Sequence, residues 1–412
     1  MNSIKLLKNE ENYRKLFFAG LINGIGDRFN QVALFAFILS ITGSGFAIGA
    51  ALSVRIIPYL IFAPYGSWLT GRFSKKTIMI TTDLARVLVA LSFLLVRTVN
   101  DIWFIYVGLF FLAAGEAIYQ PIRKTMIVEE VEEKNLLSVN TLEQVLLGVV
   151  LVFGSATGGF ASHFFSPQFV FVLNSISFLV AGFIIFFIHT KQMEQLKVTE
   201  KQSLWLNMKN GFLYLKKNTV LLKLFIIDLL IPLADGMFNV LISFYAFKKF
   251  EQGDVGIGIF YGALGLGLII SMWVPISRFT HLFRAGSMAM VLEGVFQSVL
   301  SQTNSFILAI CLFSFISLSS GIGNAAYDTV LMKTTDKQER GSVFALFEMI
   351  RNVMIGLSML SAGFLLTYFP PQFLGIAAGL FFVLVGICAC VVSYFRKKEY
   401  HLQSYEMEYN NE

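Results

Sequence analysis

The stretch LFFAGLINGIGDRFNQVALFAFILSI, residues 16–41, is an apolar run interrupted near its middle by one acidic and one basic side chain, Asp27 and Arg28. A helix needs about 20 mostly apolar residues to cross the hydrocarbon core of a bilayer. The run is longer than the apolar region of about 7–15 residues in a secretory signal peptide, and a polar segment precedes it. We therefore expect a transmembrane helix that is not removed as a signal and that carries charges at mid-depth.

Eleven further apolar runs follow along the chain. The 412 residues are 56% hydrophobic and 14% charged, whereas a soluble domain has about 25% charged residues. Lipid must therefore be part of the solvent around this chain. We predict an all-α, polytopic membrane protein with twelve transmembrane helices, at residues 14–40, 46–69, 78–97, 103–122, 137–162, 167–189, 219–247, 255–277, 285–301, 305–327, 342–368 and 371–395.

The basic residues fall almost entirely on one set of connecting segments. If the N-terminus lies in the cytoplasm, the cytoplasmic segments hold 24 Lys and Arg residues, and the outer loops hold only Arg97, Lys248 and Lys249. Lys and Arg near span ends collect on the cytoplasmic side of membrane proteins. We therefore predict a multi-pass protein of the cell membrane with both termini in the cytoplasm. The net charge of +6 reflects this topology, and no nucleic-acid partner is expected.

The longest polar stretch divides the chain into two groups of six spans. We predict an N-terminal half at 1–190, a cytoplasmic linker at 191–218, a C-terminal half at 219–395 and a cytoplasmic tail at 396–412. Within the linker, apolar residues recur at helical spacing beside three lysines, which predicts an amphipathic helix in the membrane interface. The tail from residue 399 onward is polar, and we expect it to be mobile.

The two halves resemble each other at an offset of about 204–209 residues. Matching positions are Asp27 with Asp235, Phe29-Asn30 with Phe238-Asn239, Arg72-Phe73 with Arg278-Phe279, Tyr119 with Tyr327, Ser138-Val139 with Ser342-Val343, and Gly159-Phe160 with Gly363-Phe364. Collinear matches of this kind indicate duplicated halves related by an axis along the membrane normal. Two such halves can rock against each other and expose a midplane site to one side at a time.

The loop after the second span reads Ser67-Trp-Leu-Thr-Gly-Arg-Phe-Ser-Lys-Lys76. It resembles the corresponding loop of major facilitator superfamily transporters, roughly Gly-x-Leu-Ala-Asp-Arg-Phe-Gly-Arg-Arg. Gly71 stands where the family has an acidic residue that helps to latch the cytoplasmic side, and Asp83 is the nearest candidate substitute. The resemblance covers nearly the whole chain and implies the major facilitator fold.

Three further stretches point to a branch of that superfamily. Residues 23–34 (NGIGDRFNQVAL) and 82–86 (TDLAR) resemble the macrolide-efflux and enterobactin-exporter branch of drug:proton antiporters. The Gly154-x-x-x-Gly158-Gly159 run is similar to the Gly-Pro-x-x-Gly-Gly motif of antiporters, with Ser155 in place of the proline. The resemblance implies a proton-coupled exporter.

Ionisable side chains within spans are the candidates for transport chemistry, because each costs at least about 2.5 kcal/mol on insertion scales. Asp27 is the first candidate for a proton-coupling carboxylate, since it lies at mid-span beside two glycines. Movement of Arg28 or Arg55 relative to Asp27 would change its affinity for protons. The alternative is a static pair of Asp27 with an arginine that fixes helix packing.

Four more residues are candidates for proton coupling or for the substrate cavity. Asp235 is the repeat partner of Asp27, and Asn30 and Asn239 follow these acids by about one turn. Glu143, near the start of the fifth span, is expected to serve protonation or to anchor a gate. The alternative for such polar residues is hydrogen bonding between helices, worth about 0.6 kcal/mol each in membranes.

A second group of charged residues predicts a cytoplasmic gate. Asp83 and Arg86 are three residues apart near the membrane surface, as are Glu348 and Arg351, and this spacing favours contact on a helix. With Arg72 after the second span, these four residues are the candidate gate network.

The leading hypothesis is a secondary active transporter that exports an amphipathic small molecule, such as a macrolide or a siderophore-like metabolite, in exchange for protons. The chain has no phosphate loop, no His-based cluster and no paired cysteines, so we expect no cofactor, no metal and no enzymatic activity. The partners expected are a small-molecule substrate, protons and the lipid bilayer, and the chain is expected to be a monomer. Alternatives are an uptake symporter or a lipid flippase and, from other classes, a membrane-embedded enzyme or a non-transporting receptor.

Overall fold

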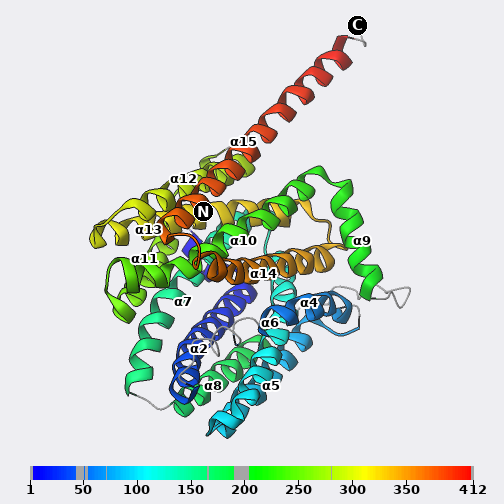
Figure 1. Cartoon of the computed structure of the whole chain (residues 1–412). Helices are drawn as coiled ribbons and strands as arrows, with labels where there is room; N and C mark the ends of the chain where they lie inside the picture. The colour runs from blue at the N-terminus through cyan, green and yellow to red at the C-terminus, as the bar shows by residue number, and fades with distance from the viewer. Residues whose placement is uncertain are drawn as a thin grey trace.

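The computed structural model describes residues 3–42, 51, 54–70, 72–164, 167–189, 204–279 and 281–409, and all regular structure in them is helical. A short helix, α1 (Ser3–Asn9), precedes the first group of long helices. This group consists of α2 (Glu11–Thr42), α4 (Ile56–Thr70), α5 (Lys75–Ser92), α6 (Ile102–Glu130), α7 (Leu136–Phe164) and α8 (Pro167–Phe186). Figure 1 shows these helices in blue to green.

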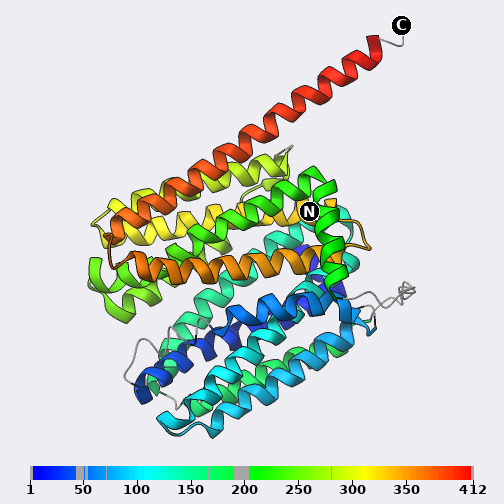
Figure 2. The same ribbon diagram turned by 45° about the vertical axis from the view of Figure 1, so that its right-hand side comes forward.

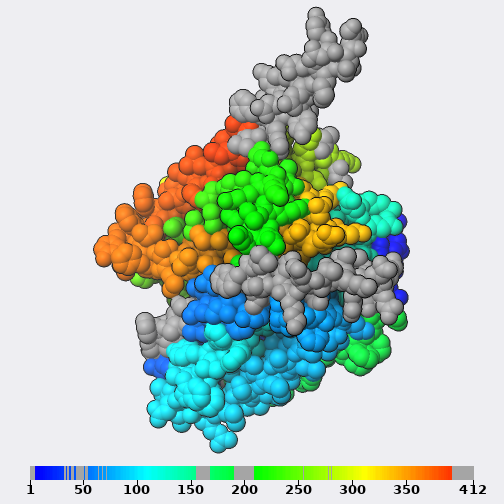
Figure 3. Space-filling model, turned by 90° about the vertical axis from the view of Figure 1, so that its right-hand side faces the viewer, coloured from blue at the N-terminus to red at the C-terminus, as the bar shows by residue number. Residues whose placement is uncertain are grey.

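The second group of long helices follows α9 (Leu204–Lys217). It consists of α10 (Thr219–Phe244), α11 (Gly253–Ser271), α12 (Leu282–Gln302), α13 (Phe306–Thr334), α14 (Arg340–Leu365) and α15 (Pro371–Tyr409). Short 3-10 turns lie at Phe93–Leu95, Val99–Asp101, Glu133–Asn135 and Ile276–Arg278, and a π-helical turn at Tyr245–Lys249. Figure 2 shows the second group above the first, and the same division is visible on the surface in Figure 3.

The described residues therefore contain twelve long helices in two six-helix halves, as the apolar runs predict. Eight of these helical segments are long and apolar enough to cross a bilayer on length and composition alone, and α11 supplies a shorter apolar helix. The remaining three, α2, α4 and α12, pack against helices of that set: α2 against α7 and α8, α4 against α6 and α14, and α12 against α13 and α15. The predicted fold class, a polytopic all-α membrane protein, is confirmed.

The ends of the bundle differ in charge. The beginnings of α2 and α10 lie at the same end, because both pack near the end of α6: Tyr13 of α2 shares a core cluster with Met126, and Leu221 of α10 shares one with Val128. We call this the basic end, because most loop lysines and arginines of the sequence fall there, and we call the other the opposite end.

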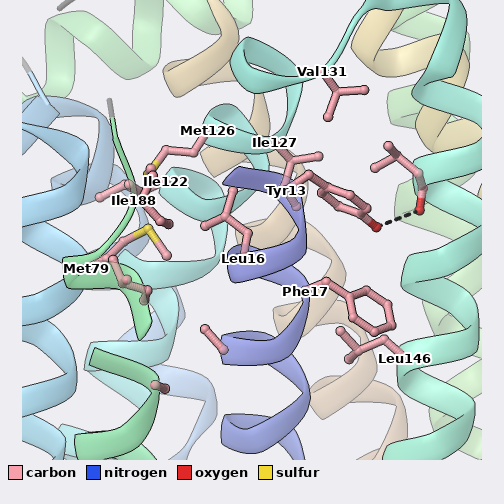
Figure 4. Packing of buried hydrophobic residues seen from close by; sticks show 14 of the residues in the cluster. Tyr13, Leu16, Phe17, Met79, Ile122, Met126, Ile127, Val131, Leu146 and Ile188 are labelled. Carbon is pink, nitrogen blue, oxygen red and sulfur yellow. Dashed lines mark hydrogen bonds between the residues drawn. The ribbon is translucent and has the colours of Figure 1, made fainter. Parts of the chain in front are cut away.

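The N-terminal half is built around the first turns of α2. Tyr13 and Leu16 are fully buried and pack among Ile122, Met126 and other apolar side chains of α6, as Figure 4 shows. Each fully buried side chain of this size stabilises the fold by about 1.5–3 kcal/mol relative to an exposed one. This cluster fixes the position of α2, the helix that carries Asp27 at mid-depth.

The two halves meet at mid-depth through glycines. A Cβ atom at Gly265 of α11 would lie 2.6 Å from the carbonyl oxygen of Gly148 in α7. Only glycine permits this approach of two backbones, and small residues have this role in membrane helix packing. A second close approach joins Gly356 of α14 to the side chain of Ile56 in α4.

Two segments outside the helix bundle, the linker and the tail, can be compared with the sequence predictions. The amphipathic helix predicted between residues 203 and 217 corresponds to α9, which packs through Gly211 against Ser342 and Leu346 of α14. The tail from residue 399 belongs to α15, which continues as a helix to Tyr409, because the segment contains good helix formers and no proline or glycine. Its mobility stays a prediction. Residues 191–203 of the linker and Gly71, where the family has its acid, lie outside the described residues.

Candidate functional site

A buried charge cluster joins the first and third spans of the N-terminal half. Arg86 of α5 donates a hydrogen bond from Nη2 to Oδ2 of Asp27 in α2 at 2.7 Å. Its Nη1 lies 3.9 Å from Oδ1 of Asp83, one turn earlier on α5. Asp83 also accepts a hydrogen bond from Asn23 of α2 at 3.2 Å. The guanidinium packs over the ring of Phe178 in α8, 4.1 Å from its centroid, so the aromatic wall further confines the cation.

The direct ion pair of Asp27 is with Arg86 and not with Arg28 or Arg55, the two arginines that the sequence suggested. Arg28 is next to Asp27 in the chain, but consecutive residues point about 100° apart around a helix. Its guanidinium donates to Gln31 at 3.2 Å, while Arg55 pairs with Glu116 of α6 at 3.2 Å. Asp27 instead contacts an arginine that was predicted to belong to a gate.

The C-terminal half holds a second charge cluster. Arg351 of α14 donates to Oδ1 of Asp228 in α10 from Nε at 3.1 Å and from Nη2 at 2.9 Å. It also lies 3.9 Å from Asp328 of α13. The expected pairing of Arg351 with Glu348 is thus replaced by a pairing between helices. Glu348 instead has its side chain near Asn352, which donates to it at 3.5 Å.

A cavity of about 90 Å³ lies between α10, α13 and α14. Its polar lining consists of Asp228, Asp235, Asn324, Tyr327, Asp328 and Arg351. Among the described ion pairs none involves Asp235, since Arg351 is directed at Asp228 and Asp328. The cavity therefore contains one carboxyl group, that of Asp235, that takes part in none of the described ion pairs.

An ion pair joins the two halves near the basic end. Lys124 of α6 donates to Oδ1 of Asp328 at 2.7 Å, with the side chains 13% and 17% exposed. Next to it, Asn140 of α7 donates to the hydroxyl of Thr329 at 3.0 Å. Sequence reasoning missed this link because both charges lie near span ends, where snorkelling to the interface is the default interpretation.

The remaining predicted residues are dispersed. Glu143 of α7 accepts two hydrogen bonds from Arg123 of α6, at 2.6 and 3.0 Å, and one from Tyr13, so it lies inside the N-terminal half. Asn239 bonds the backbone carbonyl of Asp235 at 2.9 Å.

Two others have no role in these clusters. Asn30 is buried, and its Oδ1 has no partner among the described residues. Arg72 is exposed, and its guanidinium stacks on Trp68, 3.9 Å from the ring centroid. Its described contacts include neither Asp83 nor Arg86.

The two charge clusters are built mainly from carboxyl and guanidinium groups. No group of three or more His, Cys, Asp or Glu residues in the described ranges is placed to hold a metal ion. Asp27 and Asp228 are instead paired with arginines on other helices, so helix movement would change the electrostatic environment of each of these carboxyl groups.

The fold and the buried charges together define a polytopic helical transporter built from two repeated halves. The chain belongs to the major facilitator superfamily, whose family profile matches residues 16–292. It is therefore a secondary transporter and not an enzyme.

Relatives in Bacillus subtilis (strain 168) span nearly the same length. The uncharacterized MFS-type transporter YvqJ is 24% identical over 409 residues, which cover 95% of this chain and 94% of that protein. The uncharacterized MFS-type transporter YfiS is 20% identical over 399 residues, with 94% of each chain covered.

Solved structures share the fold. The human organic anion transporter MFSD10 (TETRAN) superposes with a TM-score of 0.73 at 11% identity, covering 92% of this chain and 99% of that one. A bacterial homologue of the iron transporter ferroportin, in an outward-facing state with soaked iron, gives 0.70 at 16% identity, covering 92% and 98%. Similarity at these identities concerns the fold alone.

Proposed function

We propose that this transporter exports an amphipathic small molecule, a drug such as a macrolide or a siderophore-like metabolite, in exchange for protons. The basic end faces the cytoplasm in this proposal, with both chain termini on that side, in keeping with the positive-inside rule. The two halves, residues 1–190 and 219–395, move against each other about the linker at 191–218.

The observation that supports proton coupling most directly is the pair between Asp27 and Arg86. The two side chains come from different helices, α2 and α5, and the bond between them is 2.7 Å long. A carboxylate next to a guanidinium holds its charge, whereas the same carboxyl separated from the cation in an apolar site takes up a proton. A small relative movement of α2 and α5 would therefore convert conformational change into proton binding.

The closed basic end supports alternating access. Lys124 with Asp328 and Asn140 with Thr329 join the halves there, so in this conformation the cytoplasmic side is the side that must open. Asp83 and Arg86 lie inside the charge cluster at α2, and Arg351 lies beside the cavity. We therefore assign these three residues to coupling between the site and the gate.

The test is proton flux in sealed vesicles that contain the purified protein and a lumenal pH dye. Macrolides, dyes and siderophores are added in turn to wild type, to Asp27→Asn and to a control, Glu132→Gln, in which an exposed acid of a loop is neutralised. We expect one compound class to trigger proton flux in wild type and in the control but not in Asp27→Asn.

The outcomes also separate the alternatives. Substrate movement without proton flux in wild type would remove proton coupling altogether. Flux that accompanies accumulation toward the basic end rather than away from it would indicate an uptake symporter. Transport of a labelled phospholipid alone, with no response to any soluble compound, would indicate a lipid flippase.

A further inference from the structure

Glu293 is a buried carboxyl group that the charge clusters described above do not include. It lies near the middle of α12, about 16 Å from the start of that helix at 1.5 Å per residue, and is 8% exposed. None of the ion pairs among the described residues reaches it. An ionisable residue at this depth is expensive and marks a functional position by default.

Polar side chains connect Glu293 to the cavity of the C-terminal half. The hydroxyl of Ser320 in α13 is a polar neighbour of this carboxyl group. One turn further along α13, the amide of Asn324 donates to the same hydroxyl at 3.3 Å. Asn324 lines the cavity together with Asp235, so a short row of polar groups leads from the cavity to Glu293.

Polar groups continue from Glu293 toward the opposite end. Gln297 is four residues later, on the same face of α12. It is 1% exposed, and neither its Nε2 nor its Oε1 has a partner in the described part of the chain. The hydroxyl of Ser301 donates to the backbone carbonyl of Gln297 at 3.0 Å and lies 2.9 Å from the hydroxyl of Tyr245. Lys249, at the end of that span, donates to the carbonyl of Ser301 at 2.8 Å.

The unsatisfied amide of Gln297 is the independent sign that something occupies this row. A buried amide that lacks both donor and acceptor partners costs about 1–3 kcal/mol for each group. Buried water satisfies such groups in globular proteins, usually with about three hydrogen bonds. A water between Gln297 and Glu293 would satisfy both side chains and complete a path for a proton.

The surroundings of Glu293 contain acids and neutral groups. The carboxyl group of Asp235 in α10 is near enough to act on it electrostatically. Tyr327 faces it from α13, and Cys390 of α15 faces the same tyrosine. Glu293 corresponds to Arg86 in the internal repeat, because the two positions are 207 residues apart and the repeat offset is 204–209 residues. Where the N-terminal half pairs Asp27 with a fixed cation, the C-terminal half places a second acid near Asp235.

We propose that Glu293 is a second proton-binding group of this transporter and that it exchanges its proton with the cavity at Asp235 through Ser320. The proton leaves the carboxyl group of Glu293 for the hydroxyl of Ser320, which gives up its own proton into the cavity that Asn324 and Asp235 line. The carboxylate of Glu293 then regains a proton from water at Gln297, supplied from the opposite end. This inference rests on the proposed proton coupling and gives the C-terminal half a coupling role of its own.

A purely structural role would give a different result. If Glu293 only held α12 against α13 through Ser320, Glu293→Gln would keep that hydrogen bond and change no proton count. The critical measurement is therefore a hydrogen-ion titration of the full-length protein in lipid nanodiscs between pH 5 and pH 9, which needs no substrate. Wild type is compared with Glu293→Gln, Glu293→Asp and Asp27→Asn.

We expect Glu293→Gln to lose one titrating proton per chain, whereas Glu293→Asp and Asp27→Asn should keep the wild-type count, because Asp27 is paired with Arg86 in this conformation. A Glu293→Gln titration identical to that of wild type would overturn the proposal. If Glu293→Gln does not fold, the test is Ser320→Ala, which keeps the carboxyl group of Glu293. After a pH jump in stopped flow, we expect this variant to release the proton of Glu293 more slowly than wild type does. Release at the wild-type rate would count against the route.

Failure of this inference can be distinguished from failure of the proposed function. Loss of substrate-driven flux in Asp27→Asn, with a wild-type titration for Glu293→Gln, would leave proton coupling in place and remove only the second site. If Glu293 titrates but no compound drives proton flux, the second proton-binding group is kept and the proposed proton coupling is removed.

Discussion

The ion pair between Lys124 and Asp328 makes the most direct prediction about conformational change. It is the described ion pair that crosses between the halves at the basic end, with Nζ and Oδ1 2.7 Å apart. Asp328→Asn removes the charge with little change in side-chain volume. We expect the population of the conformation closed at the basic end to fall.

The magnitude follows from burial and from the neighbouring charge. An exposed pair is worth about 0.2–1 kcal/mol, whereas removing one partner of a buried pair costs about 3–5 kcal/mol. The side chains of Lys124 and Asp328 are 13% and 17% exposed, which places the pair between these limits. Arg351 is 3.9 Å from Asp328 and keeps its bond to Asp228 in the variant. We expect a loss of about 2 kcal/mol, or about 30-fold in the ratio of closed to open molecules.

The assay is pulsed electron paramagnetic resonance between spin labels at Thr77 and Lys333, which are exposed positions on opposite halves. The native cysteines are replaced first. A longer distance should gain population in Asp328→Asn and in Lys124→Ala but not in Asp328→Glu, which keeps the pair. Lys134→Ala is the matched control, because its partner Glu132 lies in the same loop of the same half.

An unchanged distance distribution in both Asp328→Asn and Lys124→Ala would refute this reasoning. The closed basic end would then depend on apolar packing around Val128 and Leu136, and the charge pair would not stabilise it. A shift of equal size in Lys134→Ala would show that the labels report net surface charge and not the contact between halves.

Two further predictions concern positions that hold helices together. Glu143→Ala leaves the guanidinium of Arg123 without its carboxylate inside the N-terminal half, so we expect about 3 kcal/mol of lost stability; thermal unfolding followed by intrinsic fluorescence measures it, and an unchanged midpoint would contradict the buried pairing. Gly265→Val places side-chain atoms against the carbonyl of Gly148, where even a Cβ would be 2.6 Å away. The accessibility of cysteine residues at the basic end should therefore rise. Gly258→Val is the control, because it meets open space on the same helix and should leave this accessibility unchanged.

The positions of the helices could be predicted from the sequence because lipid imposes a strong and local rule. Each span needs an apolar run of nearly fixed length, and the polar segments between runs stop it. The end of α15 was less predictable. The helix continues to Tyr409 beyond the apolar run, where hydropathy gives no signal and helix propensity alone determines where the helix ends.

The partners of the buried charges could not be predicted in the same way. Asp27 had three arginines within reach of its depth, Arg28, Arg55 and Arg86, and hydropathy does not determine how a helix rotates about its axis. That rotation is set by packing, here by Tyr13 and Leu16 in the core at the start of α2 and by Phe178 against the guanidinium. The link between Lys124 and Asp328 was missed for a related reason, because each residue alone looks like an ordinary span end.

The departures from symmetry between the halves carry a functional argument. Duplicated halves would be expected to balance their buried acids in the same way, and the N-terminal half does so with Arg86 at Asp27. At the corresponding position, 207 residues later, the C-terminal half has Glu293, and its arginine, Arg351, is directed at Asp228. Two neighbouring carboxyl groups within the membrane spans cannot both stay ionised without cost, and one shared proton removes the conflict. In the proposed mechanism, a proton in the C-terminal half therefore supplies the charge that an arginine supplies in the other half, and unlike the arginine it can leave.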